Sequence, residues 1–422
     1  RMAKEGMTFT QFYAGSSVCA PSRSVLMTGQ HTGHTRVRGN AGRTLPDAQS
    51  LQADDTTVAG VLREAGYATG LIGKWGLGSE SNAGDPKKQG FDYYFGFLNQ
   101  THAHNHYPHF LWRNGERVEL PNDLVHLGDH EGTGYATKKL AYANDLFFTE
   151  AEQFVSRHRA QPFFLYLALT TPHANNERSR ALGDGNEVPD EAYADYADRP
   201  WTTANKGHAA MITRMDRQIG DLLAKLKELG LDEKTLVMFS SDNGAHREGG
   251  PDYSPEFFQV SGPLRGIKRD LYEGGLRVPL IARWPGQVAA GAVSKHVAYF
   301  GDLLATCAQL GKAKTPAKLD SLSFVSALTG ASGQAMHPYL YWELYERGFN
   351  QALLIDGRWK AIRLKNAKAP IQLFDLTNDL GEKNDVAAQH PDQVQRAREL
   401  FVTARTDNTY WKFDSVMPAA KP

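Results

Sequence analysis

The sequence predicts an α/β fold with a mainly parallel central sheet and helices on both of its faces. Three observations support this prediction: amphipathic helices alternate with short apolar strands, glycines stop the helices, and polar residues follow the strands. With 422 residues, of which 41% are hydrophobic, the chain is long enough to bury a large core. Because ligands of such sheets bind at the carboxyl ends of the strands, the polar residues there are candidates for one site.

The first element is the run MTFTQFYA at residues 7–14, which we expect to form a strand. It leads to Cys19, and Pro21 suits the first turn of a helix, where its missing N–H needs no partner. A single cysteine beside a strand is usually a buried structural thiol, and Arg23 could be a surface charge. Taken alone, this segment predicts no chemistry.

The second element is the stretch DDTTVAGVLREAGYATGLIGKWG. Asp55 or Thr56 can cap a helix that Gly66 stops, and we expect a strand at residues 67–72. This strand leads to Lys74, which could equally be an ordinary turn residue.

The third element pairs a helix at residues 144–158 with the run FFLYLAL at residues 163–169. A continuous apolar run is typical of a strand that is covered on both faces. It leads to His173, although a histidine after Thr-Thr-Pro is often a loop residue bonded to the backbone.

The fourth element is a long helix at residues 209–229, whose apolar residues recur at helical spacing. A strand at residues 235–239 follows it and leads to Asp242 and Asn243. Asp-Asn-Gly is also a common turn sequence, because Asn tolerates left-handed conformations and Gly has no Cβ.

The rest of the chain adds one more candidate and a second domain. Lys268 lies in the Gly-rich segment GIKRDLYEGG, which could fold back over the site. We expect a catalytic α/β domain at residues 1–334 and a small α+β subdomain with an antiparallel sheet at residues 335–422, with a turn at Asp356-Gly357.

Together these residues supply a nucleophile, cations, an imidazole and oxygen ligands, which is what transfer of an anionic group requires. Charges balance at 47 basic and 47 acidic residues, so nothing predicts a nucleic-acid partner. No apolar run approaches the roughly 20 residues that span a bilayer, so we expect no membrane span. The two cysteines, Cys19 and Cys307, make no disulfide framework.

The segment CAPSR, which begins at Cys19, resembles the C-x-P-S-R signature of the type I sulfatases, a family of the alkaline phosphatase superfamily. The segments GYATGLIGKWGLG, TTPH, SDNGAH and GIKRDLYEGGLRVP are similar to further segments of that family and follow its order. The C-terminal LLIDGRWKAIRL and QLFDLTNDLGEKNDVA resemble its small terminal subdomain. The resemblance covers nearly the whole chain.

This resemblance implies that a maturation enzyme oxidises Cys19 to Cα-formylglycine, whose hydrate attacks the sulfur of a sulfate ester. It implies one divalent cation, Ca²⁺, held by Asp242, Asn243 and the modified Cys19.

The resemblance also implies roles for the charged residues. Arg23, Lys74 and Lys268 would neutralise charge around the nucleophile and the sulfate. His173 would contact the sulfate or protonate the departing alcohol, and Lys268 competes for that acid role.

Two departures from the family pattern stand out. The family normally opens with a strand that ends in a metal-binding Asp-Asp pair, and this chain begins after it, which we interpret as a truncated reading of a longer gene. Many members have His after Gly-Lys-Trp, where this chain has Gly76. His102 or His104 in NQTHAHNHYPHF could supply that imidazole, or the cluster could be a polar surface loop.

Loops rich in His, Tyr and Trp favour a sulfated carbohydrate over an aryl sulfate as the substrate. The resemblance implies a periplasmic or secreted location. Three other functions stay open: a phosphodiesterase or phosphonate hydrolase of the same superfamily, a non-catalytic carbohydrate-binding relative, and a thiol-dependent hydrolase that uses Cys19 and a histidine.

Overall fold

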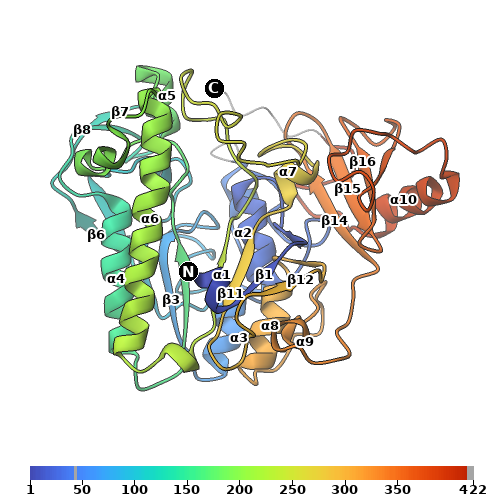
Figure 1. Cartoon of the computed structure of the whole chain (residues 1–422), viewed down its shortest axis with the longest axis horizontal. Helices are drawn as coiled ribbons and strands as arrows, with labels where there is room; N and C mark the ends of the chain where they lie inside the picture. Colours follow the sequence, from blue (N-terminus) through green and yellow to red (C-terminus); the bar gives the residue numbers. More distant parts are fainter. Residues whose placement is uncertain (42–44, 416–422) are drawn as a thin grey trace. The chain divides into compact units, whose positions relative to one another are not determined.

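The computed structural model of the chain describes residues 1–41 and 45–415 (Figure 1). The chain forms two compact units, and each has sheets of its own. Unit 1 comprises residues 1–65, 236–245 and 261–422, and unit 2 comprises residues 66–235 and 246–260. The predicted boundary between residues 334 and 335 stays a prediction.

Unit 1 contains a four-stranded mixed sheet in the order β10-β11-β1-β12 and a two-stranded parallel sheet of β2 and β13. In the larger sheet β1 pairs antiparallel with β11 and parallel with β12. The run at residues 7–14 forms two short strands because its two halves pair with different partners. The bounds are β1 Met7–Phe9, β2 Phe12–Tyr13, β10 Val237–Ser240, β11 Leu280–Arg283, β12 Ala292–Ser294 and β13 Ala298–Tyr299.

The helices α2, α3 and α8 pack against one another in unit 1, in the blue and orange parts of Figure 1. Helix α2 is buried along its whole length and begins at Cys19, two residues before the predicted start at Pro21. The cap of α3 is Thr57, whose side-chain oxygen accepts the Gly60 N–H, so the prediction of Asp55 or Thr56 was wrong. The bounds are α2 Cys19–Thr28, α3 Val58–Glu64 and α8 Asp302–Leu310.

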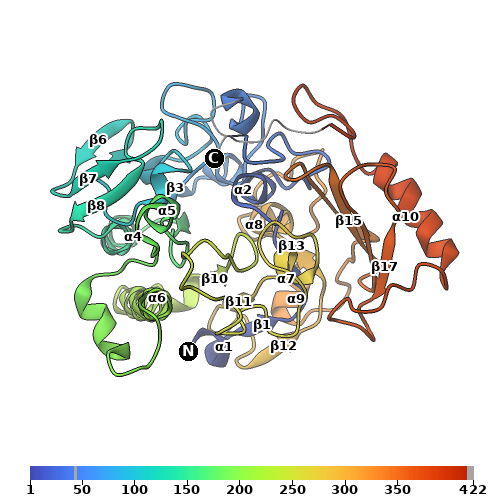
Figure 2. The ribbon, with the colours of Figure 1, turned by 90° about the horizontal axis from the view of Figure 1, so that it is seen from above.

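The predicted C-terminal antiparallel sheet is confirmed, in the order β14-β15-β16-β17. Asp356 and Gly357 join β15 to β16 with φ values of 53° and 67°, which suits a two-residue hairpin turn. Helix α10 contacts β15 and β16 and contributes Ala397 and Phe401 to the core beneath it (Figure 2). The bounds are β14 Tyr339–Leu344, β15 Asn350–Ile355, β16 Trp359–Arg363, β17 Gln372–Asp375 and α10 Pro391–Thr403.

Unit 2 contains a five-stranded sheet in the order β6-β5-β4-β3-β9. The strand β3 is parallel to both β4 and β9, whereas β5 and β6 run antiparallel in a hairpin. The α/β class is therefore confirmed, with mixed pairing in both units. The bounds are β3 Ala68–Lys74, β4 Tyr93–Phe97, β5 Phe110–Arg113, β6 Glu116–Glu119 and β9 Phe163–Ala168.

Two long helices support this sheet. Helix α4, at Ala143–Arg157, contacts β3, β4 and β9, and α6, at Thr203–Glu228, packs against α4 (Figures 1 and 2). Helix α6 begins six residues before the predicted start, because Thr202 caps it by accepting the Asn205 N–H. Across residues 1–41 and 45–415, no helix combines the length and apolar character that a bilayer crossing requires.

The remaining elements are short. They are α1 Met2–Glu5, α5 Asn176–Leu182, α7 Glu273–Leu276, α9 Val325–Thr329, the paired strands β7 Asp123–His126 and β8 Gly134–Lys138, and the 3₁₀ turns η1 Pro46–Gln49, η2 His102–His104, η3 Asp190–Tyr196 and η4 Asp232–Lys234.

A buried charged group joins three parts of unit 1. The carboxylate of Glu273 accepts hydrogen bonds from Tyr13 Oη at 2.9 Å, Arg277 Nε at 2.7 Å and Lys360 Nζ at 2.7 Å. A second buried carboxylate, that of Glu382, accepts the Glu273 N–H and lies 3.8 Å from Lys360 Nζ. Burial raises the pKa of Glu382 from 4.5 to about 7, and the charge of Lys360 opposes this shift.

We predict that Glu382→Gln flattens the pH dependence of stability between pH 4.5 and 7. In this window the folded protein binds a proton at Glu382 that the unfolded chain releases, so the free energy of unfolding falls as pH rises. At about 1.4 kcal/mol per pKa unit, the fall amounts to about 3 kcal/mol. Chemical denaturation at pH 5 and pH 8 measures it. The exposed Glu64→Gln variant should keep the wild-type slope, and an equal slope in the Glu382 variant would refute the assignment.

Candidate active site

Cys19 is the first residue of α2 and is buried. The residue before it, Val18, is extended, so the chain turns into the helix at the cysteine itself. The N–H groups of the first turn of a helix have no acceptor within the helix, so this end carries a partial positive charge that favours an anion. Ala20, next in the helix, donates its N–H to Asn40 Oδ1 at 3.1 Å. Both cysteines are free thiols.

Two residues of the CAPSR segment hold the surroundings of Cys19 in place. Ser22 Oγ accepts the N–H of Gly15, which fixes the loop between β2 and α2. The Arg23 guanidinium donates to one oxygen of Asp242, from Nε at 3.0 Å and from Nη2 at 2.9 Å. Arg23 is buried, so this ion pair joins α2 firmly to the segment that follows β10.

The segment after β10 presents oxygen atoms that suit a hard cation. Asn243 Oδ1 is buried and has no hydrogen-bond partner among the described residues, while its Nδ2 donates to the Gly244 carbonyl. A buried acceptor without a donor is costly unless something else binds it. A carboxylate beside an amide oxygen is a donor set that Ca²⁺ accepts. Asp242 and Asn243 therefore fit the expected cation.

The lysine loop, residues 266–272, is bonded to the segment of Asp242 and to the segment of Cys19. The Lys268 N–H donates to the Ala245 carbonyl at 2.8 Å, and the Arg269 N–H donates to the Ser17 carbonyl at 3.0 Å. A Cβ at Gly244 would lie 1.9 Å from the Gly274 carbonyl oxygen, so this approach requires glycine. Unit 1 thus brings the segments of Cys19, Asp242 and Lys268 together. Among the described residues, the buried hydroxyls of Ser16 and Ser17 lack hydrogen-bond partners.

In unit 2 the structure confirms that Lys74 and His173 follow neighbouring parallel strands. Lys74 is the last residue of β3 and is buried, and β3 pairs with β9 up to Gly73 opposite Ala168. His173 follows the end of β9 at the same edge of the sheet. Its Nδ1 lies 2.7 Å from the Ala174 carbonyl oxygen, so this nitrogen carries a proton and donates it.

His173 stacks between two other histidines. The His104 ring is nearly parallel to the His173 ring, with centroids 5.0 Å apart. The centroid of the His246 ring lies 5.5 Å from that of His173, and the two ring planes are inclined by 28°. His104 Nδ1 lies 3.1 Å from Glu177 Oε2. His246 Nε2 donates to the Pro172 carbonyl at 2.9 Å, and its Nδ1 accepts the Glu248 N–H at 3.0 Å.

The structure separates the two histidines that the sequence left open. His104 lies against His173, whereas His102 packs between the rings of Phe97 and Phe110. Burial lowers the pKa of His102 to about 3, so its ring is neutral.

Gly76 occupies the position at which a histidine was expected. Its φ is 78°, which disfavours a residue with a side chain, and a Cβ there would lie 2.8 Å from Gln100 Nε2. The Gln100 amide is buried, and neither its oxygen nor its nitrogen has a hydrogen-bond partner among the described residues.

Sequence reasoning missed Glu177 and His246 as members of this group. His246 was within reach, because it ends the quoted segment SDNGAH. Glu177 lies in α5, and no local pattern connects it with His104, 73 residues earlier. That the residues of units 1 and 2 act on one substrate stays a prediction from the sequence.

Comparisons with known proteins identify the family models and proteins that the chain resembles. The family model described as Sulfatase matches residues 1–313, and that of the N-sulphoglucosamine sulphohydrolase C-terminal region matches residues 267–402. The chain is 30% identical over 379 residues to N-acetylgalactosamine-6-sulfatase of Canis lupus familiaris, with 86% of this chain and 65% of that enzyme covered. It is 29% identical over 484 residues to N-acetylgalactosamine-6-O-sulfatase of Bacteroides thetaiotaomicron, with 96% and 87% covered.

A solved structure extends the likeness to the fold. The crystal structure of Ps i-CgsB in complex with k-i-k-neocarrahexaose matches with a TM-score of 0.77 at 26% identity and covers 98% of this chain and 88% of that one. The expected alkaline-phosphatase-like fold is confirmed.

We predict that Asn243→Leu abolishes stabilisation by Ca²⁺ and leaves the stability of the metal-free protein nearly unchanged. The substitution removes an acceptor that only a cation would satisfy, and a ligand at 100 times its Kd stabilises by about 2.7 kcal/mol. The Tm with EDTA and with Ca²⁺ measures both effects. The exposed Asn384→Leu variant should respond to Ca²⁺ as the wild type does, and a full Ca²⁺ response in Asn243→Leu would rule out this ligand.

Proposed function

The chain belongs to the sulfatase family, and from that premise we propose that it hydrolyses sulfate esters of a carbohydrate with a nucleophile derived from Cys19. One observation carries the proposal: Cys19 begins a buried helix whose next turn holds Arg23 against Asp242, beside an unsatisfied oxygen of Asn243. A nucleophile, a cation and cation ligands in one unit suit attack on an anionic ester.

Two groups complete this chemistry. Conversion of Cys19 to formylglycine would supply a hydrated aldehyde oxygen as the nucleophile, and a bound divalent cation would withdraw charge from the sulfate. Asp242 and Asn243 would hold the cation, and Arg23 orients Asp242. The buried hydroxyls of Ser16 and Ser17 offer hydrogen bonds next to position 19. Lys268 would place a positive charge close to the sulfate.

We assign the proton for the departing alcohol to His173. Its Nδ1 donates to the Ala174 carbonyl, which fixes the orientation of the ring, and we assign the transferred proton to Nε2. His246 uses both nitrogens on the backbone of Pro172 and Glu248, so it orients the His173 ring and carries no proton to the substrate. His104, bonded to Glu177, supports the other face of that ring. Lys268 is the competing acid.

A sulfated sugar is the proposed substrate class. One relative is named N-acetylgalactosamine-6-sulfatase and another N-acetylgalactosamine-6-O-sulfatase. The structure of Ps i-CgsB was solved in complex with k-i-k-neocarrahexaose. The unsatisfied amide of Gln100 suits a sugar hydroxyl, which both donates and accepts. Sulfated glycans are met outside the cytoplasm, so we propose a periplasmic or secreted enzyme that a formylglycine-generating enzyme matures.

We predict that Cys19→Ala abolishes hydrolysis of 4-nitrophenyl sulfate and of sulfated sugars. The mass of the peptide that contains residue 19 should show formylglycine in wild-type protein from a host able to form it. Cys307→Ala is the matched control, because burial raises the pKa of this thiol to about 12 and makes it inert.

The same assay separates the rival functions. Higher activity on phosphonate or phosphodiester substrates than on sulfate esters would assign the second superfamily function. Full activity with an unmodified Cys19 would assign a thiol-dependent hydrolase. Sugar binding without turnover, in protein with formylglycine and Ca²⁺, would leave a carbohydrate-binding protein.

We predict that His173→Ala impairs sugar sulfates far more than 4-nitrophenyl sulfate. A sugar alkoxide is a poor leaving group that needs a proton, whereas 4-nitrophenolate leaves without one. A general acid typically contributes about 10²–10⁴-fold, and that factor should separate the two kcat ratios. If Lys268→Ala shows this selectivity and His173→Ala does not, the acid is Lys268.

A further inference from the structure

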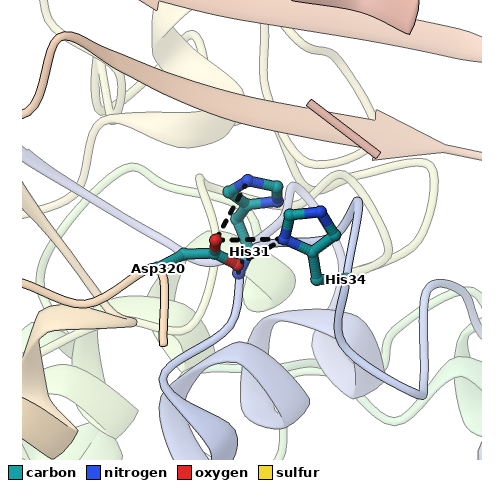
Figure 3. Close-up of side chains that lie close together, drawn as sticks. All are labelled: His31, His34 and Asp320. Atoms are coloured by element: carbon teal, nitrogen blue, oxygen red, sulfur yellow. Dashed lines mark hydrogen bonds and ion pairs between the residues drawn. The ribbon is translucent and has the colours of Figure 1, made fainter. Parts of the chain in front are cut away.

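A second cluster of metal-ligating side chains lies in unit 1, at the other end of α2 from Cys19. The carboxylate of Asp320 points at the rings of His31 and His34 (Figure 3). Asp320 Oδ2 lies 2.9 Å from His34 Nδ1, and Asp320 Oδ1 lies 3.6 Å from His31 Nε2. One ligand atom from each of the three residues can be chosen so that all lie within 4.8 Å of one another. We propose that His31, His34 and Asp320 form a zinc site that is independent of the proposed sulfatase activity.

The local sequence fixes the positions of both histidines. Gly29 ends α2 in the left-handed conformation, with a φ of 66°. The chain then turns tightly, because the N–H groups of His34 and Thr35 both donate to the His31 carbonyl. This turn puts the two rings side by side, with centroids 4.5 Å apart.

Asp320 is held to the same turn by its backbone as well as its side chain. Its N–H donates to the Gly29 carbonyl, and its carbonyl accepts the Tyr299 hydroxyl. Its Oδ2 also accepts the backbone N–H of His31 at 3.0 Å. Such contacts orient a metal ligand before the metal arrives, which lowers the cost of binding.

The spacing of the ligand atoms suits zinc. Bonds of about 2.0–2.2 Å in a tetrahedral site put neighbouring ligand atoms about 3.4 Å apart. The distances of 2.9 Å and 3.6 Å from Asp320 to the two rings bracket this value. Two imidazoles and one carboxylate are ligands that zinc accepts, whereas Ca²⁺ prefers oxygen atoms alone.

The cluster is open to solvent on one side, from which an ion and a water as fourth ligand could enter. The side chains of His34 and Asp320 are 31% and 21% exposed, so solvent reaches the cluster. The His31 ring is buried. The carboxylate of Asp320 supplies the negative charge that a cation requires.

Two hydrogen bonds oppose zinc binding. Zinc would replace the first, between His34 Nδ1 and Asp320 Oδ2, which are 2.9 Å apart; the second is made by the other ring. His31 Nδ1 accepts the Gly33 N–H at 3.1 Å, so the ring proton is on Nε2. Zinc at Nε2 moves that proton to Nδ1, where it faces the Gly33 N–H and the hydrogen bond is lost. We expect this loss to weaken binding by about tenfold relative to a fully matched site.

The site is distinct from the expected catalytic cation site. The ten residues of α2 separate Cys19 from Gly29, which is about 15 Å along the helix axis. A zinc ion here would fix the turn after α2 to the segment that precedes α9. Its effect on stability is thus measurable without any assay of hydrolysis.

The test is a zinc titration of the EDTA-treated protein by calorimetry, with the Tm as a second readout. His34→Gln is the main variant, because its amide can still donate to Asp320 while the imidazole ligand is lost. Asp320→Asn is the second variant and removes the charge. His158→Gln, on a histidine at the end of α4 that bonds to Gln161, is the matched control.

We expect the wild type and His158→Gln to bind one more zinc ion than His34→Gln and Asp320→Asn, and excess Ca²⁺ not to displace it. The zinc-dependent rise in Tm should disappear in the two site variants. Equal zinc stoichiometry in the wild type and in a folded His34→Gln variant would overturn the proposal, as would displacement by Ca²⁺. Because Cys19→Ala leaves this site intact, failure here is separable from failure of the sulfatase assignment.

Discussion

The buried carboxylate of Glu273 is the group on which the rest of unit 1 depends. It binds Tyr13 at the start of the chain, Arg277 before β11 and Lys360 in the C-terminal sheet. Removing one partner of such a buried pair leaves an uncompensated charge and typically costs about 3–5 kcal/mol. Three parts of the chain that are far apart in the sequence are thereby held in one arrangement.

The lysine loop inherits its position from this constraint. Glu273 begins α7 directly after the loop, and its N–H is bonded to Glu382. The other end of the loop is bonded to the backbone near Cys19 and Asp242. A charge such as Lys268 stabilises a transition state only if it is already in place, since reorganisation during the reaction consumes the gain. The buried polar groups thus hold the backbone around Lys268 at both ends of the loop.

The sequence predicted what is local, and the structure added what is distant. Short apolar segments placed β3 and β9, and therefore Lys74 and His173, because each signal lies within a few residues. It could not reveal that Lys360 pairs with Glu273, 87 residues away, or that Asp320 meets His31, 289 residues away. Such pairs leave no periodic trace. The predicted cap of α3 was wrong for another reason. All four residues at 54–57 have side chains that can cap a helix, and only the geometry selects Thr57.

The histidines show how the protein assigns different tasks to identical side chains. Each imidazole has two nitrogens, and the backbone groups bonded to them decide which nitrogen carries the proton. His246 has both nitrogens bonded to the backbone, so it can only orient its neighbour. His173 donates from Nδ1 to the Ala174 carbonyl, whereas His31 accepts at Nδ1 from the Gly33 N–H. The roles of the histidines therefore follow from their backbone contacts, which the sequence pattern does not specify.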